Sequence, residues 1–240
     1  MSSELEARLA TVQGELDALQ AEYNEYTYTV SHDLAAPFRQ IEGFARIVLS
    51  KYEDQFDEKS RRHFDLIIKG ANNGASMVES LLSYSRICTA PTDTKAVDCN
   101  IIVAKVLAEH KDLIDKSNVD ISYSQLPVIN GDSTQIGRLF YHLIHNAILY
   151  HKPDSSPVVE ISSAQDESGW NFRISDNGIG IPENQLDKVF MVLKRAVRDK
   201  EYPGAGMGLA IAKRIVQHHR GYISIETNKG EGCTVHVFLP

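Results

Sequence analysis

The sequence has few cysteines and lacks a long apolar run, and each absence excludes a class of protein. Its three cysteines, Cys88, Cys99 and Cys233, show no metal-ligand spacing in a chain of 240 residues. An odd number of scattered cysteines is typical of reduced thiols, so we expect a cytoplasmic protein. No apolar run approaches the roughly 20 residues that a membrane span needs, and no signal peptide precedes the first helical pattern.

A surplus of basic residues is also missing. The net charge is −7, which argues against nucleic acid as a partner, because nucleic-acid binding needs a concentrated basic face. With 42% hydrophobic and 24% charged residues, the composition is that of an ordinary globular protein. The length allows one large domain or two small ones.

Apolar residues near the N-terminus recur in alternating steps of four and three. This heptad seam consists of Leu5, Leu9, Val12, Leu16, Leu19, Tyr23, Tyr26 and Val30. It predicts a coiled coil over residues 1–28, through which the chain forms a homodimer. A single amphipathic helix packed on a globular core is the alternative, but so narrow and regular a stripe favours self-association.

The segment Ser31–Pro37 (SHDLAAP) interrupts this pattern. An extra step of four after Val30 is a stutter, which locally unwinds a supercoil, and Pro37 is predicted to kink the helix. His32 lies off the seam and is predicted to face solvent. An ordinary core helix does not need a histidine beside a carboxylate such as Asp33, so His32 is a candidate reactive group.

A second helical pattern covers residues 64–85. It follows a polar connection at Lys51–Lys59 and precedes a linker at Thr89–Lys95. Two helices joined by a short loop form an antiparallel hairpin, and two hairpins in a dimer form a four-helix bundle. We assign residues 29–90 to this hairpin.

The remainder, residues 91–240, has a mixed pattern. Periodicity predicts helices at about 99–117, 132–150 and 207–219, and strands at about 119–124, 158–164, 170–176, 221–228 and 232–239. The last two strands are joined by an Asn-Lys-Gly-Glu-Gly turn and form a hairpin. Helices combined with a largely antiparallel sheet make the fold class α+β.

A first candidate motif, Asp176–Ile181 (DNGIGI), follows a predicted strand. Its glycines, Gly178 and Gly180, allow an open turn directly after a carboxylate. A buried Asp176 can accept a hydrogen bond from the exocyclic amine of adenine. Taken alone, the motif fits a plain turn equally well.

A second motif, Gly204–Leu209 (GAGMGL), opens an apolar helix. Glycines at a helix N-terminus let phosphate oxygens approach backbone N–H groups. A dinucleotide-binding turn is the alternative, because Glu226 lies twenty residues after Gly206. We reject it, since that turn needs a strand directly before the glycines, whereas Arg195–Pro203 is polar and ends in proline.

A third motif lies in the predicted helix 138–150. His142, Asn146 and Tyr150 recur every four residues and share one face. The side-chain oxygen of Asn146 can bind Mg²⁺, a cation that prefers oxygen ligands. The alternative is an asparagine whose amide is satisfied within the core.

In their order along the chain, these motifs are similar to those of the sensor histidine kinases of two-component signalling. The similar segments are SHDLAAP (H box), His145-Asn146-Ala147 (N box), Asp176–Ile181 (G1 box), Val189-Phe190-Met191 (F box) and Gly204–Ala212 (G2 box). The resemblance covers residues 20–240, and the H box and the segment Arg198–Gly204 are most similar to those of phytochrome-type kinases.

This resemblance implies a dimerisation and histidine-phosphotransfer domain, followed by a Bergerat-type ATP-binding domain, an α/β sandwich. ATP with Mg²⁺ would phosphorylate His32, and Asp33 would orient its ring. Asn146 would hold the Mg²⁺ and Asp176 would bind adenine. The rest of the nucleotide site would consist of Tyr150, Gly178, Gly180, Gly204, Gly206, Gly208 and Leu209. The phosphoryl group would then pass to an aspartate of a response-regulator receiver domain.

The chain departs from the family pattern in three places. His142 replaces an asparagine and Leu149 replaces a lysine of the N box. The segment from Lys194 through the glycines of the G2 box is here called the lid. Its basic residues could supply the missing charge, or they form a solvated face; they are Lys194, Arg195, Arg198 and Lys200. Ala36 replaces a Thr or Asn that orients water in relatives, and because alanine has no hydrogen-bonding side chain we expect weak or absent phosphatase activity.

Two other functions remain open from the sequence. A conformational ATPase with the same nucleotide fold would share the glycine motifs but would have no use for SHDLAAP. A non-catalytic dimeric scaffold with a degenerate nucleotide site would agree with the changes at His142 and Leu149.

Overall fold

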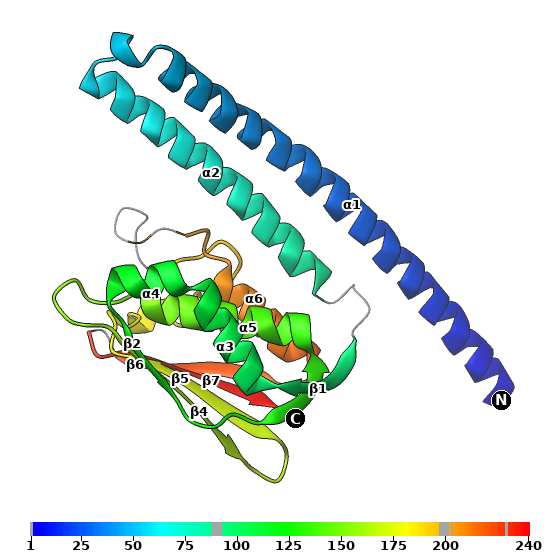
Figure 1. Cartoon of the computed structure of the whole chain (residues 1–240). Coiled ribbons are helices and arrows are strands. Elements are labelled where there is room, and N and C mark those ends of the chain that lie inside the picture. Colours follow the sequence, from blue (N-terminus) through cyan, green and yellow to red (C-terminus); the bar gives the residue numbers. More distant parts are fainter. Residues whose placement is uncertain (1, 88–92, 197–201, 203, 229) are drawn as a thin grey trace. The chain divides into compact units, whose positions relative to one another are not determined.

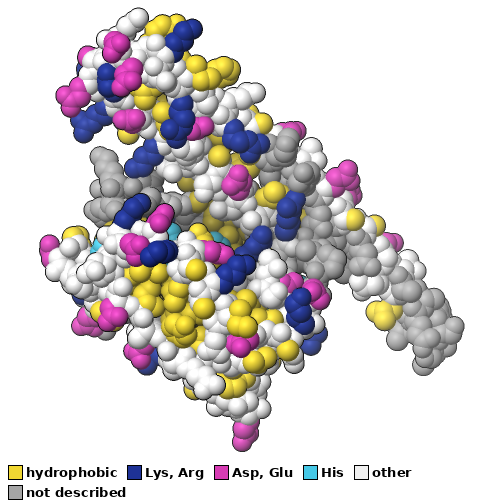
Figure 2. Space-filling view, viewed as in Figure 1, with side chains coloured by type: hydrophobic (Ala, Val, Ile, Leu, Met, Phe, Trp, Pro, Cys, Tyr) yellow, Lys and Arg dark blue, Asp and Glu magenta, His cyan; other side chains and the backbone are white. Residues whose placement is uncertain are grey.

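The computed structural model describes residues 2–87, 93–196, 202, 204–228 and 230–240. It divides into two compact units, Met1–Thr89 and Ala90–Pro240. No helix in these described ranges is long and apolar enough to cross a membrane. On the face that Figure 2 shows, Lys and Arg side chains are interspersed with Asp and Glu on each unit.

The first unit is an antiparallel helical hairpin (Figure 1). Helix α1, Ser2–Lys51, is followed by the short 3-10 helix η1, Glu53–Gln55, and by helix α2, Glu58–Arg86. Asp57 caps α2, because its carboxylate accepts the N–H of Ser60 at 2.8 Å. The predicted hairpin is therefore confirmed.

Helices α1 and α2 pack closely where α2 has a glycine. A Cβ atom on Gly74 would lie 2.5 Å from the ring of Phe38 in α1, so only a residue without a side chain leaves room for this ring. Near this contact, α1 runs through Pro37 without ending (Figure 1).

The heptad seam is exposed in the single chain. Seam side chains whose burial is described, such as Leu9 at 72% and Tyr26 at 68% exposed, contact little of their own chain. Exposed apolar residues continue along α1 at Ile41, Phe44 and Ile47. Apolar surface of this extent suits association with another helix, and the coiled coil and the dimeric bundle remain predictions.

The second unit contains all of the strands that the structure describes. Its elements are β1 Thr94–Asp98, α3 Cys99–Glu109, α4 Lys111–Ser117, β2 Asp120–Tyr123, β3 Val128–Asp132, α5 Ser133–Leu149, β4 Val158–Gln165, β5 Trp170–Asp176, η2 Glu183–Gln185, α6 Gly208–His218, β6 Tyr222–Asn228 and β7 Gly232–Leu239.

Five of these strands form one sheet in the order β2-β4-β5-β7-β6. Only β2 and β4 run parallel; the other neighbours are antiparallel. Helices α5 and α6 pack against one face of the sheet, and α3 packs on α5 (Figure 1). Phe140 of α5 meets Phe172 of β5 edge to face at 5.5 Å within this core. The α+β fold class is thus confirmed for the unit.

The structure corrects three details of the prediction. The helix expected at 99–117 is two helices, α3 and α4, separated at His110. Strands β1 and β3 were missed; they form a separate antiparallel pair. Lys95, assigned to the linker, lies in β1, while residues 88–92 of that linker are outside the described residues.

Candidate nucleotide-binding site

Asp176, at the end of β5, is a largely buried carboxylate. Its Oδ1 accepts the backbone N–H groups of Gly178 at 2.9 Å and Cys233 at 3.1 Å. Burial is the main influence on this group and raises the pKa of Asp176 to about 6. Among the described residues none donates to Oδ2, so this oxygen is available to a hydrogen-bond donor on a ligand.

The turn after Asp176 is held from two sides. A Cβ atom on Gly178 would lie 2.3 Å from the carbonyl oxygen of Tyr150, which explains why glycine stands there. The same carbonyl accepts the N–H of Ile179 at 3.0 Å. On the other side, the N–H of Gly230 donates to the Ile179 carbonyl at 2.8 Å. The turn therefore lies between the end of α5 and the β6–β7 hairpin.

The N-terminus of α6 faces the side chains of α5. An ideal Cβ on Gly208 would lie 3.6 Å from both amide atoms of Asn146 and 3.5 Å from Nδ1 of His142. Met207, which precedes the helix, gives it no side-chain cap. Among the described residues, no side chain caps the backbone N–H groups of the first turn, including that of Leu209, so they can receive an anion beside Asn146.

His142 is neutral at this position. Burial, followed by the neighbouring charges of His145 and Arg138, lowers the pKa of His142 to about 4. Burial and His110 likewise lower the pKa of His145 to about 4. The histidine that replaces the family's asparagine thus adds a hydrogen-bonding ring near the anion site and no positive charge at neutral pH.

The described parts of the lid are tied to one another and to α5. Arg195 donates Nη1 to the carbonyl of Gly204 at 3.0 Å and Nη2 to the carbonyl of Tyr202. The hydroxyl of Tyr202 donates to the carbonyl of His151 at 2.9 Å, and its ring lies 5.3 Å from that of Tyr150. Arg195 therefore joins two described residues of the lid, a different role from the phosphate contact expected of lid cations.

The glycines of the lid have backbone angles that side chains rarely adopt. Gly204 has φ +145° and Gly206 has φ +69°. A Cβ on Gly206 would also lie 2.8 Å from Cγ of Arg195, so this residue must be glycine for Arg195 to reach the lid carbonyls.

The structure brings most of the predicted nucleotide residues together. Tyr150, Asp176 and Gly178 meet at one end of α5, whereas Asn146 and Gly208 meet one turn away. Lys194 is exposed, and Arg198 and Lys200 lie outside the described residues. Sequence reasoning missed Tyr202, for which an aromatic residue in a polar, glycine-rich loop is the available signal.

His32 and Asp33 belong to the other unit. Both lie in the continuous helix α1, where Asp33 and Pro37 are exposed and Ala36 is half-buried. Their roles in catalysis remain predictions.

Residues 131–240 match the family described as "Histidine kinase-, DNA gyrase B-, and HSP90-like ATPase". The phytochrome-like protein Cph1 of Synechocystis is 31% identical over 97% of this chain and 31% of its own length. The sensor-like histidine kinase SenX3 of Mycobacterium tuberculosis is 30% identical over 99% of this chain and 60% of its own length. The chain thus spans about a third of the phytochrome relative.

A solved structure shares the fold along most of the chain. Full-length ShkA in complex with AMPPNP has a TM-score of 0.68 and 20% identity, and the match covers 90% of this chain and 45% of that one. The matched ATPase family and the relatives along the whole chain support a sensor histidine kinase, and the fold shared with ShkA agrees with this.

Proposed function

We propose that the chain is a kinase core that binds Mg²⁺-ATP in its second unit and transfers the γ-phosphoryl group to His32. The phosphoryl group then passes to an aspartate of a response-regulator receiver domain. One observation carries the proposal: Asp176, Asn146 and the uncapped N-terminus of α6 lie around the same helix, α5.

These residues fit the parts of ATP. The free Oδ2 of Asp176 suits the exocyclic amine of adenine, which is a donor. The first turn of α6 suits the phosphates, because its N–H groups and the helix dipole attract anions. The nucleotide analogue held by ShkA, which has this fold, supports the assignment.

Asn146 fits a magnesium ion that ATP brings with it. Over the described ranges, no group of three or more His, Cys, Asp or Glu side chains could hold a metal. Mg²⁺ bound to nucleotide needs few protein ligands, since phosphates and water supply the others. Once bound, the ion would offset the negative charge that develops on the phosphates.

The phosphoryl transfer needs a neutral ring nitrogen on His32. This nitrogen attacks the γ-phosphorus, the bond to the β-phosphate oxygen breaks, and ADP leaves. The carboxylate of Asp33 holds the proton on the other ring nitrogen and makes the attacking one more nucleophilic. In the second step, the carboxylate of the receiver's aspartate attacks the phosphorus, the bond between phosphorus and the His32 nitrogen breaks, and the imidazole ring leaves.

Other parts of the proposal rest on single positions. Lys194 and Arg198 are candidate phosphate contacts that compensate for Leu149, and Ala36 predicts weak phosphatase activity. We also propose a homodimer through residues 1–28, a phosphotransfer domain at 29–90, an ATP domain at 91–240, a phytochrome-type relationship and a cytoplasmic location.

Labelling with γ-³²P-ATP and Mg²⁺ tests the proposal in the wild type, His32→Ala and a control, His63→Ala. His63 is an exposed histidine of α2. We expect acid-labile, base-stable label on the wild type and the control, and none on His32→Ala. ATP turnover without label would instead indicate a conformational ATPase, and the absence of both label and turnover a scaffold.

A further inference from the structure

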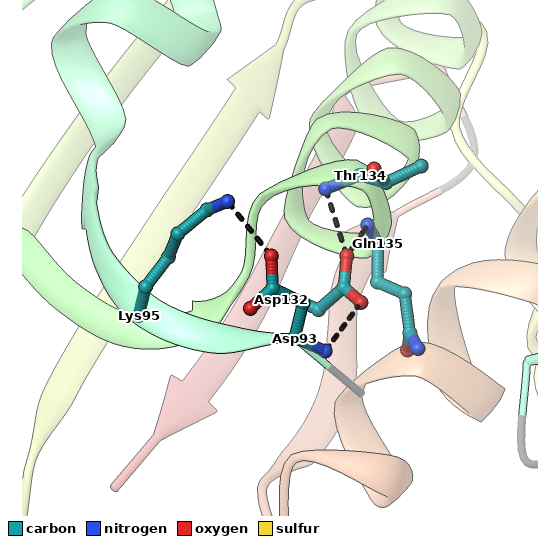
Figure 3. A network of polar contacts seen from close by, with 5 residues as sticks. All are labelled: Asp93, Lys95, Asp132, Thr134 and Gln135. Atoms are coloured by element: carbon teal, nitrogen blue, oxygen red, sulfur yellow. Dashed lines mark hydrogen bonds and ion pairs between the residues drawn. The ribbon is translucent and has the colours of Figure 1, made fainter. Parts of the chain in front are cut away.

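Asp132, between β3 and α5, contacts three segments of the second unit. Its Oδ1 caps α5 by accepting the N–H groups of Thr134 at 2.9 Å and Gln135 at 3.0 Å (Figure 3). Its Oδ2 accepts the N–H of Asp93 at 3.4 Å. Its own N–H donates to Nε2 of His219, which ends α6, at 3.2 Å.

Asp93 is the first described residue after the boundary between the two units. The chain then continues as Asp93–Asp98, which we call the linker segment because it directly follows the boundary. It enters the second unit as β1 and pairs along β3, with Thr94 opposite Asp132. Because β3 runs directly into α5, the linker segment and the start of α5 are both hydrogen-bonded to the same residue, Asp132.

Charges at this point are balanced locally. Nζ of Lys95 lies 2.9 Å from the Asp93 carboxylate (Figure 3). The pair is exposed and contributes little energy by itself. The position of Asp93 beside Asp132 therefore rests on its backbone hydrogen bond and on the pairing of β1 with β3.

Helix α5 extends from this attachment to the candidate nucleotide site. Its 17 residues span about 25 Å at 1.5 Å per residue. It carries Asn146 within its last turns and is followed by Tyr150, while α6, attached through His219, begins at Gly208. A hydrogen-bonded helix moves as a unit, so a displacement at either end reaches the other.

We propose that Asp132 is a positioning residue that couples the linker segment to the helices of the nucleotide site. Nucleotide bound between α5 and α6 then restrains the linker segment, and the linker segment in turn orients α5. The inference rests on the proposed nucleotide site, since α5 can transmit binding only if the ligand contacts it.

Hydrogen–deuterium exchange of the full chain, with and without AMPPNP and Mg²⁺, tests this coupling. Asp132→Ser keeps an N-cap oxygen but removes the second one, and Asp132→Asn keeps the shape of the side chain. Asp57→Ser is the matched control, because Asp57 caps α2 in the other unit. Nucleotide affinity and thermal unfolding are measured for each variant.

In the wild type and the control, we expect nucleotide to slow exchange both in α5 and in residues 93–97. In the Asp132 variants the effect on α5 remains, whereas the effect on residues 93–97 falls roughly threefold to tenfold, as expected for one lost hydrogen bond. A structural role alone would reduce both effects together.

Two outcomes would overturn the coupling while leaving the proposed function intact. One is nucleotide binding that leaves residues 93–97 unaffected, and the other is the same slowing in the wild type and both Asp132 variants. If the wild type binds no nucleotide at all, the proposed function fails, and the coupling fails with it.

Discussion

The backbone N–H of Cys233 donates to Oδ1 of Asp176 at 3.1 Å across 57 positions of sequence. This bond joins the first residues of β7 to the last residue of β5 and helps to hold a carboxylate in a largely buried place. Burial outweighs the two N–H bonds, since the pKa of Asp176 is raised to about 6. The folded protein therefore keeps a charge at neutral pH that its surroundings disfavour.

Asp176→Asn should make the protein more stable while it weakens nucleotide binding. The pKa of Asp176 rises from 3.8 to about 6 on folding, so ionisation makes the fold less stable as the pH rises through this range. Asparagine keeps an oxygen for both N–H groups, and we expect unfolding at pH 7.5 to require more free energy, on the order of 1–2 kcal/mol. This gain should shrink as the pH falls from about 6 toward 3.8, because Asp176 then becomes protonated in the folded and finally in the unfolded state.

The same variant should bind AMPPNP at least about tenfold more weakly, because the amide can present a donor to the amine of adenine. Asp187→Asn, at an exposed position, is the control. Thermal unfolding between pH 4 and 8 and calorimetric titration measure the two effects. A variant that is less stable at pH 7.5, or that binds normally, would contradict this account.

Asn146→Ala should make nucleotide binding insensitive to magnesium. With Mg²⁺ present we expect affinity for AMPPNP to fall about tenfold to a hundredfold, and with EDTA to change less than about threefold, because only the ion's ligand is lost. Asn130→Ala removes an exposed amide from β3 and serves as the control. Equal losses with and without Mg²⁺ would point to a structural role for Asn146.

Two glycine substitutions near α5 should act in opposite directions. Gly178→Ala places a Cβ 2.3 Å from the Tyr150 carbonyl, so we expect a loss of about 1–3 kcal/mol. Gly137→Ala, inside α5, meets no heavy atom within 4 Å and should stabilise by about 0.5–1 kcal/mol. Urea unfolding measures both, and a tolerated Gly178→Ala would mean that the turn is not held as described.

A charge in the heptad seam should dissociate the proposed dimer. Leu19 is 64% exposed in the single chain, and Leu19→Glu would bury a carboxylate in a helix–helix seam. We expect a monomer by sedimentation at micromolar concentration. Ala21→Glu adds the same charge outside the seam and should leave the association state unchanged, whereas a monomeric wild type would remove the basis for the coiled coil.

Local patterns sufficed for the strongest elements. The apolar period of α5 predicted the helix to within one residue at each end, 132–150 against 133–149. Strands β1 and β3 were missed because they are short and their pairing joins Thr94 to Asp132, far away in sequence. The break at His110 was missed because the ring of this residue, 4% exposed, is buried by packing on α5, and the local pattern does not show such packing.

The candidate site was predictable where its chemistry lies in contiguous residues. Asp176, Asn146 and Gly208 belong to short motifs, and the structure brings these motifs together around α5. The contacts of Arg195 with lid carbonyls depend on the folded path of the loop, which composition does not encode. The neutral state of His142 likewise depends on its burial and on the nearby charges of His145, Arg138 and His110, of which His110 lies between α3 and α4.

Strand β7 lies between β5 and β6, although it is the last strand of the unit to be synthesised. While a ribosome still holds residues 232–239, β5 has no partner on that side and Asp176 lacks the N–H of Cys233. The Asp176 end of the proposed nucleotide site therefore forms only after this strand has emerged. A nascent chain can fold its helical hairpin before β7 is made, yet it completes the proposed nucleotide site only after β7.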